Sequence, residues 1–217
     1  MLHILLYIII PSLLYTEPSE EHFYSTSGHV ALRMQCPELG TDFVYDYVGD
    51  NLDRPIIAYL TGDLKMGLQL MPTDEFLAYE GRPSVDYPLQ LNDTMILALC
   101  NILDKEYRRG FVKPYDPFQG SCSEMIVQYI HQAAVCTHTR EDYHFAPADD
   151  LPFREMCLHY MHNNKVAYWI YGICFHKYLP KHDWPKLKKV VFPEQLLYLF
   201  QHSTLNDRPI LKENAQK

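Results

Sequence analysis

The sequence predicts an α+β fold, an antiparallel sheet packed against helices, with strands early in the chain and helices later. Alternation of apolar and polar side chains, the period of a strand, is concentrated before residue 92. Apolar residues at helical spacing dominate most of the chain beyond that point. The chain has 217 residues, of which 47% are hydrophobic and 21% charged, so it can form one globular domain with a sizeable core.

The first half of the chain contains the clearest strands. Residues 29–34 alternate between two faces, and residues 43–48 follow after a turn, so the two segments predict an antiparallel hairpin. Further strand-like segments lie at residues 64–71, 85–91 and 166–175. A short helix or loop is expected at residues 55–60.

The second half is expected to be mainly helical. Apolar residues at helical spacing predict helices at residues 93–107, 122–136, 153–162 and 193–202. Asn92 or Asp93 is expected to cap the first of these helices. Residues 137–152 are polar and are expected to form a surface loop.

The two ends of the chain are expected to lie outside a single domain at residues 16–202. Residues 1–15 are strongly apolar but contain Pro11 and no Lys or Arg, which leaves three alternatives open. They are a signal or leader segment, an interfacial anchor, or the first buried strand of the domain. Residues 203–217 are polar, and we expect them to form a tail that frays.

Composition excludes several classes of function. The net charge of −8 disfavours nucleic acid as a partner, because phosphate binding requires a basic surface. The six cysteines contain no CxxC pair, and a chain of this size needs no disulfide framework. Neither a glycine-rich phosphate loop nor a GxSxG motif is present.

Cys122 is the most distinctive residue, because it is expected at the first position of a helix. Ser121 can serve as the N-cap, and Glu124 three residues later completes a capping box. A thiol at a helix N-terminus lies beside unpaired N–H groups and the positive end of the helix dipole, which both favour the reactive thiolate. The alternative is a small buried cysteine at the start of a core helix.

A nucleophilic cysteine needs a base, and His29 is the best candidate among the histidines. It opens a strand, where it is rigidly held, and Gly28 allows another segment to come close. Asp46 on the neighbouring strand could orient the imidazole. The alternatives are a partly exposed histidine at the edge of a strand and an Asp46 that faces water between two tyrosines, which the sequence slightly favours.

Donors for an oxyanion hole are also available around Cys122. Its own backbone N–H is one, and Gln119, Ser27 or Tyr115 could add another, although polar loop residues often only cap turns. A competing metal site could use His159 and His162, three residues apart on one helix. No third or fourth ligand is evident nearby, so neither a metal nor a cofactor is expected.

Several segments resemble a known family. Tyr24 to Arg33 (YSTSGHVALR) resembles the start of the soluble, extracytoplasmic domain of Lnb, the lipoprotein N-acylating transacylase. Four later segments resemble that family in the same order: Val44 to Gly49, Tyr79 to Leu91 with Arg82, Phe118 to Ser123, and Phe192 to Leu196. The resemblance covers roughly residues 20–200, and its specific parts are the Gly-His-x-Ala-Leu-Arg and Cys-Ser elements.

The family is similar to circularly permuted papain-like enzymes, which include NlpC-type peptidases and lecithin–retinol-type acyltransferases. The resemblance therefore implies a permuted papain-like fold, Cys122 as nucleophile and His29 as base. Tyr24 and Arg82, which belong to matched segments, are taken as binding residues. The implied reaction transfers an acyl group through a thioester, with a lipoprotein or another acylated envelope molecule as substrate and an extracytoplasmic, membrane-associated location.

Two departures from the family pattern matter. Ser121 stands where the family often has Asn, which removes any role for that amide. The sequence also lacks the membrane helices of full-length Lnb enzymes, so access to a bilayer substrate would rest on residues 1–15 or on a partner. Two other functions stay open at this point: a cysteine amidase or peptidase of the cell envelope, and a catalytically inactive binding domain.

Overall fold

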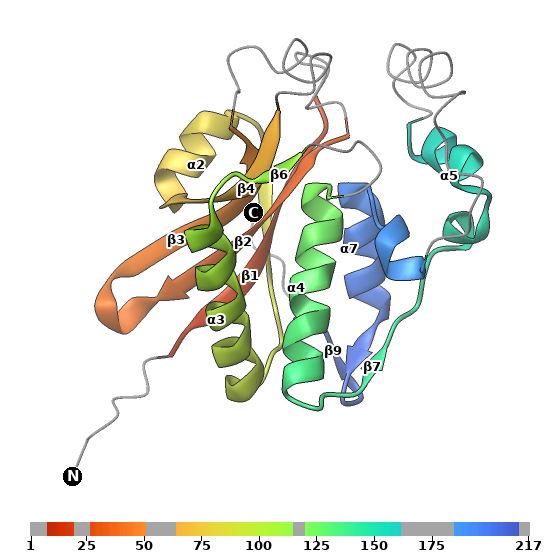
Figure 1. The fold of residues 1–217 in the computed structure, drawn as a ribbon. Coiled ribbons are helices and arrows are strands. Elements are labelled where there is room, and N and C mark those ends of the chain that lie inside the picture. Colours follow the sequence, from red (N-terminus) through yellow and green to blue (C-terminus); the bar gives the residue numbers. More distant parts are fainter. Residues whose placement is uncertain (1–7, 20–26, 51–63, 115–119, 162–184, 213–217) are drawn as a thin grey trace.

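A six-stranded antiparallel sheet forms the centre of the molecule (Figure 1). The computed structural model describes residues 8–19, 27–50, 64–114, 120–161 and 185–212. The strands, in chain order, are β1 (Ile10–Thr16), β2 (His29–Cys36), β3 (Thr41–Gly49), β4 (Lys65–Pro72), β5 (Ser84–Pro88) and β6 (Lys113–Pro114). Their order across the sheet is β5-β1-β2-β3-β4-β6. The expected α+β class and the hairpin of β2 and β3 are confirmed.

The main helices occupy the positions that the apolar spacing predicts. They are α2 (Thr73–Glu80), α3 (Asp93–Arg109), α4 (Cys122–Cys136), α5 (Phe153–Tyr160) and α7 (Pro193–His202), of which only α2 was not expected. Within the described ranges, short 3₁₀ helices lie at Pro37–Leu39 (η2), Pro147–Asp150 (η3) and Lys186–Lys189 (η4). The side chain of Asn92 caps α3 by accepting the N–H of Met95, so Asn92 rather than Asp93 is the N-cap.

The apolar N-terminal segment supplies a central strand. β1 pairs with β2 on one side and with β5 on the other, and Leu13 and Leu14 are buried. Of the three alternatives left open for this segment, residues 10–16 therefore form the buried strand. The described domain therefore includes residues 10–16 as well as the expected range that begins at residue 16.

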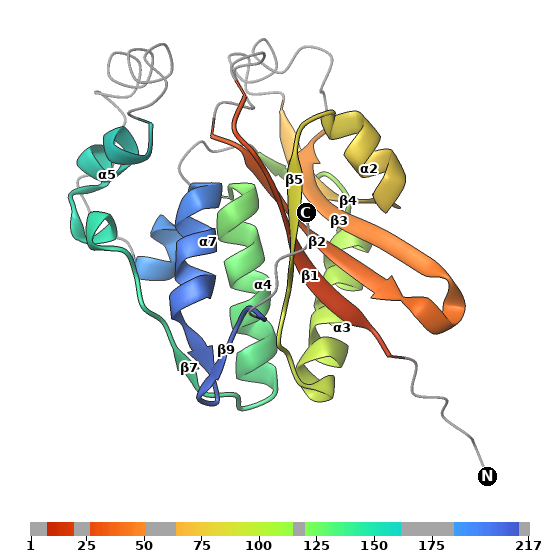
Figure 2. The same ribbon diagram turned by 180° about the vertical axis from the view of Figure 1, so that it is seen from behind.

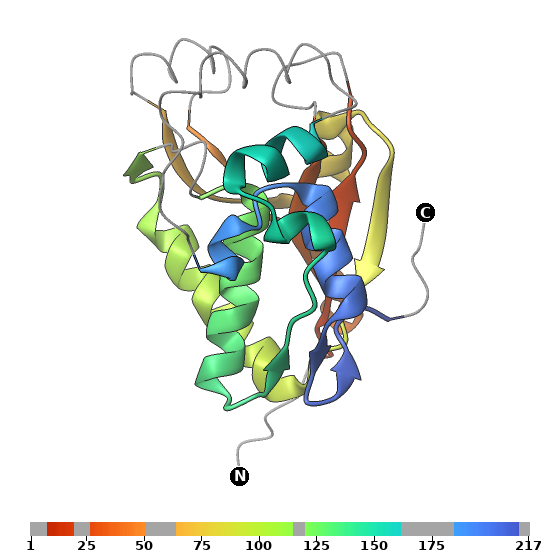
Figure 3. The ribbon, with the colours of Figure 1, turned by 90° about the vertical axis from the view of Figure 1, so that its right-hand side faces the viewer.

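The C-terminal residues 203–212 are also part of the fold, so the expectation of a fraying tail is wrong for them. They form β8 (Thr204–Leu205) and β9 (Arg208–Pro209), which join β7 (Glu141–Asp142) in a three-stranded sheet. This sheet lies beside the C-terminal ends of α4 and α7 (Figure 3). Ile210 and Leu211 both belong to the main core, and Ile210 is fully buried. The backbone of Leu211 also forms an isolated β-bridge with Leu89. The expected loop at residues 137–152 likewise contains β7 and η3.

The sheet has a helical layer on each face (Figures 1 and 2). On one face, α3, α4 and α7 bury the larger core with alternate strand residues such as Leu13, Val30 and Leu32. On the other face, α2 buries a small cluster formed by Phe76 with Leu14, Ala31, Val44 and Met71. The two-residue period of the strands thus divides the apolar residues between two unequal cores.

Helix α2 is an element that the apolar spacing did not indicate. It is short, its N-cap Pro72 offers no side-chain acceptor, and its amphipathic character is weak. Its ends nevertheless carry recognisable signals: Asp74 and Glu75 in the first turn, and Gly81 at the C-terminus with φ of 60°.

The predicted segments at residues 55–60 and 166–175 lie outside the described residues. The expected helix at residues 153–162 ends at Tyr160. Within the ranges that the structure describes, no helix has the length and apolar content needed to cross a membrane.

Candidate active site

Cys122 is the first residue of α4, as its sequence context predicts. The side chain of Ser121 accepts the N–H of Glu124 at 3.1 Å and so caps the helix. The carboxylate of Glu124 accepts the N–H of Gly120 at 2.5 Å, one residue earlier than a capping box requires. The helix start is therefore held from two sides, which fixes the backbone that carries the thiol.

His29 is the first residue of β2, and Gly28 allows the close packing that precedes it. Gly28 has φ of 78°, in the left-handed region that favours glycine. A Cβ atom at this position would lie only 2.7 Å from the carbonyl oxygen of Thr16. The glycine thus lets the end of β1 approach the chain just before His29, and a larger residue would push the two apart.

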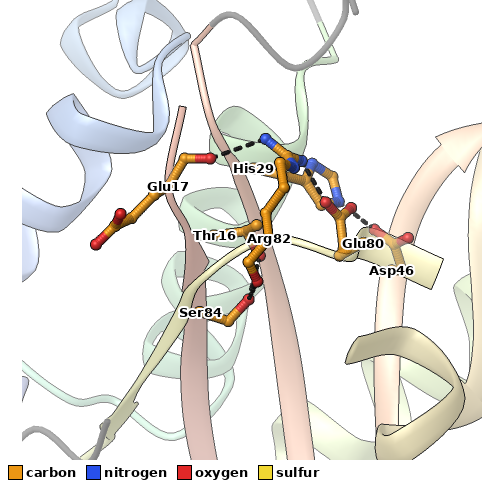
Figure 4. Close-up of polar contacts among 7 residues, drawn as sticks. All are labelled: Thr16, Glu17, His29, Asp46, Glu80, Arg82 and Ser84. Carbon is orange, nitrogen blue, oxygen red and sulfur yellow. Dashed lines mark hydrogen bonds and ion pairs between the residues drawn. The ribbon is translucent and has the colours of Figure 1, made fainter. Parts of the chain in front are cut away.

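Asp46 lies next to His29 because of the register of the β2–β3 hairpin. Leu32 pairs with Tyr45 at the end of the paired segment, and continuing this register brings His29 and Asp46 together on the same face. His29 Nε2 lies 2.6 Å from Asp46 Oδ1 (Figure 4). Asp46 is only 1% exposed, so the alternative in which it faces water is wrong.

The thiol of Cys122 lies close to this pair. The His29 side chain and the backbone N–H of Val30 are both near enough to lower the pKa of the thiol. A carboxylate can only accept, so Nε2 of His29 carries a proton toward Asp46. The other ring nitrogen, Nδ1, is then the one able to take the proton of the thiol.

The surroundings raise the pKa of His29. Burial is the largest single influence and would lower it, but the charges of Asp46 and Cys122 and the hydrogen bonding of the ring to both partners together outweigh burial. The net result is a pKa well above 6.5, the ordinary value for histidine. The imidazolium form is therefore stabilised at this site.

The pKa of Cys122 moves in the opposite direction. Burial alone would raise it, and the charge of Asp46 adds slightly to that increase. The charge of His29, its hydrogen bond and the N–H of Val30 act against burial and lower the pKa below the ordinary thiol value. A lowered thiol pKa beside a raised imidazole pKa favours a thiolate–imidazolium pair.

Helix α2 covers the imidazole from the face of the sheet opposite to α4. The ring of Phe76 is fully buried, and its centroid lies 6.3 Å from that of His29 with the planes tilted by 32°. Ala31, two residues after His29 on the same face of β2, belongs to the same small buried cluster as Phe76. Phe76 is a residue of the site that the sequence pattern did not indicate, because its helix was not expected.

Arg82 lies at the same end of the sheet, between α2 and β5 (Figure 4). Its guanidinium forms an ion pair with Glu80 and donates from Nη1 to the carbonyl oxygen of Glu17 at 2.9 Å. Two residues later, Ser84 shares a 2.9 Å hydrogen bond with Thr16, which pairs with His29 in the sheet. The structure therefore brings Arg82 into the neighbourhood of His29, where it contacts protein groups.

Of the remaining predicted residues, some are described by the structure and others are not. Ser27 is described and lies in the turn two residues before His29. Tyr24, Tyr115 and Gln119 lie outside the described residues, as does His162 of the alternative metal pair. His159 is on α5, and the described part of the chain contains no group of three or more His, Cys, Asp or Glu side chains that could hold a metal ion.

No protein-family model, no curated protein and no solved structure matches this chain. The arrangement of Cys122, His29 and Asp46 must therefore be interpreted from its own geometry.

Proposed function

We propose that the chain is a cysteine-dependent acyl-transfer enzyme with Cys122 as nucleophile, His29 as base and Asp46 as the group that orients the imidazole. The observation that supports this most directly is the 2.6 Å contact between His29 and buried Asp46, with the Cys122 thiol close enough to the imidazole for each group to shift the pKa of the other. A nucleophile, a base and an orienting carboxylate in this order form the general arrangement for covalent acyl transfer.

The first half-reaction forms a thioester. Sγ of Cys122 attacks the carbonyl carbon of an acyl ester while His29 holds the thiol proton. The tetrahedral intermediate collapses, the ester C–O bond breaks, and His29 gives the proton to the departing alcohol. In the second half-reaction an amine attacks the thioester, His29 takes a proton from the amine, and the amide leaves as the thiolate re-forms.

The N-terminus of α4 supplies the donors that this chemistry requires. The N–H groups of Cys122 and Ser123 occupy the first two helical positions, where no intrahelical acceptor exists. They lie beside the attacking sulfur, so they can stabilise the oxyanion of the tetrahedral intermediate together with the helix dipole.

Fold and chain order favour the permuted papain-like interpretation. An antiparallel sheet carries the base on a strand, a helix with the cysteine at its N-terminus packs against that sheet, and the histidine precedes the cysteine in the chain. The five sequence segments that resemble Lnb add the substrate class. They favour a lipoprotein whose diacylglyceryl-cysteine end supplies both the acyl group and the amine, at the extracytoplasmic membrane surface.

A two-step trapping experiment tests the proposal. Incubation with a p-nitrophenyl acyl ester should release p-nitrophenol and add one acyl group to Cys122, detected by intact-protein and peptide mass spectrometry. A synthetic diacylglyceryl-cysteine peptide should then accept the acyl group as an amide faster than water hydrolyses the thioester. The variant C122A should show neither step.

Other outcomes would point elsewhere. Hydrolysis that no amine can outcompete, together with cleavage of cell-wall peptides, would favour the amidase or peptidase instead. An absence of any Cys122 adduct, with full retention of fold, would contradict catalysis and favour a binding domain.

A further inference from the structure

The end of the sheet that carries His29 holds a second polar group, on the face covered by α2. Pairing places Thr16 between His29 and Ser84, so these three residues point to the same face. Arg82 precedes Ser84 by two residues, and Figure 4 shows its guanidinium on the His29 side of the sheet. Arg82 and His29 therefore occupy one surface at the ends of adjacent strands.

The ion pair between Arg82 and Glu80 is nearly buried, with exposed fractions of 11% and 8%. It closes a short connection, because Glu80 is the last residue of α2 and Arg82 leads into β5. The bond from Arg82 to the carbonyl oxygen of Glu17 adds the end of β1 to the same contact. Three segments of the chain are thus tied together by one guanidinium, whose planar fork suits such bridging.

The last turn of α2 leads directly to the imidazole. Phe76 and Glu80 are four residues apart and so share one face of the helix. Phe76 lies against the ring of His29, and Glu80 is held by Arg82. A displacement of the end of α2 would therefore move the surface on which the ring rests.

We propose that the Glu80–Arg82 ion pair positions the His29 imidazole by holding α2, and with it Phe76, against the end of the sheet. The hydrogen bond to Asp46 holds only Nε2 of the His29 ring. The rest of the ring could still rotate about that contact. Phe76 limits this rotation and keeps Nδ1 of His29 directed at Cys122. Arg82 is thus a positioning residue that acts through the helix. The inference rests on the proposed function only in taking His29 as the base of Cys122.

The test is the pH dependence of Cys122 alkylation by iodoacetamide, followed by peptide mass spectrometry so that other thiols do not contribute. In R82K and E80Q, the acid limb of the rate profile should shift to higher pH, toward that of an ordinary thiol. A shift of one unit corresponds to a roughly tenfold lower rate at pH 6. Circular dichroism of the variants should remain that of the wild type.

The matched control is R33K. Arg33 also bridges strands on this face, because it pairs with Asp42 and with Asp86. It lies four residues further along β2 than His29, about 13 Å away at the usual rise of a strand. Its substitution should leave the Cys122 profile unchanged, whereas a general loosening of the sheet would shift it as well.

Unchanged profiles in folded R82K and E80Q would overturn the proposal. If those variants do not fold, F76L provides a second test. It leaves the Glu80–Arg82 ion pair intact and removes the aromatic contact of residue 76 with the His29 ring. It should reproduce the shift, and an unchanged profile in F76L would contradict the inference equally. Because alkylation requires no acyl substrate, a wild type with an activated thiol but no acyl transfer would contradict the proposed function alone.

Discussion

Cys122 and Cys157 show how much the surroundings decide the chemistry of a thiol. Both lie on helices, and both are free thiols. Cys157 is in the interior of α5, where burial raises its pKa to about 12. Cys122 is partly buried, which would also raise its pKa, but His29 and the N–H of Val30 together outweigh burial and lower it. Burial alone makes a cysteine inert, and a cationic partner is what reverses the effect.

The largest expected effect comes from removing the sulfur. C122A should abolish the acyl-enzyme, because the proposed thioester forms on this sulfur. C157A should retain it, since the Cys157 thiol is protonated at neutral pH. Intact mass after incubation with an acyl ester measures both. An acyl adduct that persists in C122A would contradict the prediction that Cys122, and not Cys157, is the nucleophile.

Removal of His29 should make the Cys122 thiol as unreactive as the buried thiol of Cys157. In H29A, only the N–H of Val30 still acts against burial, so the pKa of Cys122 should rise. We expect acyl transfer to fall on the order of 10²–10⁴-fold, and alkylation at pH 6 to become slow. H131A is the control, because His131 also contacts a carboxylate, Glu141, at 2.7 Å. Equal losses in both variants would show that His29 has no special role.

Asp46 should have a smaller effect than His29. D46N keeps the size of the side chain but lets its amide donate to Nε2, which favours the tautomer that cannot accept the thiol proton. The rate should therefore fall and the pKa of His29 should drop, as measured by NMR titration. E141Q provides the corresponding change at His131, and an unaltered His29 titration in D46N would contradict the orienting role.

The contribution of His29 to stability should depend on pH in a defined direction. Its pKa is raised on folding, so the stability that it contributes is fully present below pH 6.5 and is lost as the pH rises through the raised value. The difference in melting temperature between wild type and H29A should accordingly shrink toward alkaline pH. A difference that grows with pH would imply a lowered pKa for His29.

Gly28 provides the smallest test of the site, through stability alone. G28A should destabilise the fold by more than about 1 kcal/mol, because φ is positive and the new Cβ would meet the carbonyl oxygen of Thr16. G40A shares the positive φ, but no atom lies within 4 Å of its Cβ position. Denaturant melts should therefore show a larger loss for G28A than for G40A. Equal losses would mean that the close approach before His29 has little effect.

Local signals in the sequence were sufficient for several elements. The bounds of α4 follow from its capping residues and apolar spacing, and those of α7 follow from apolar spacing. The alternation of β2 and β3 predicts their hairpin. Cys122 and His29 stand out for the same reason, since each begins an element. Such features depend on neighbours within a few residues, which sequence patterns report well.

Other features required distant contacts. The sequence left Asp46 between a buried and an exposed position, and the strand register decided it. The apolar N-terminal segment could have been a leader, an anchor or a strand until its pairing with both β2 and β5 was known. Residues 203–212 look like a polar tail, yet Ile210 and Leu211 fill a core formed by residues far away in the chain.

The sequence by itself thus determined the helix that carries Cys122 and the strand that carries His29. The tertiary structure decided that these two residues meet, that Asp46 is buried beside them, and that α2 covers the ring through Phe76 and the Glu80–Arg82 pair. The physical reason is that caps and periodicity arise from local backbone geometry. Register, burial and pKa depend on side chains that come together only when the sheet forms.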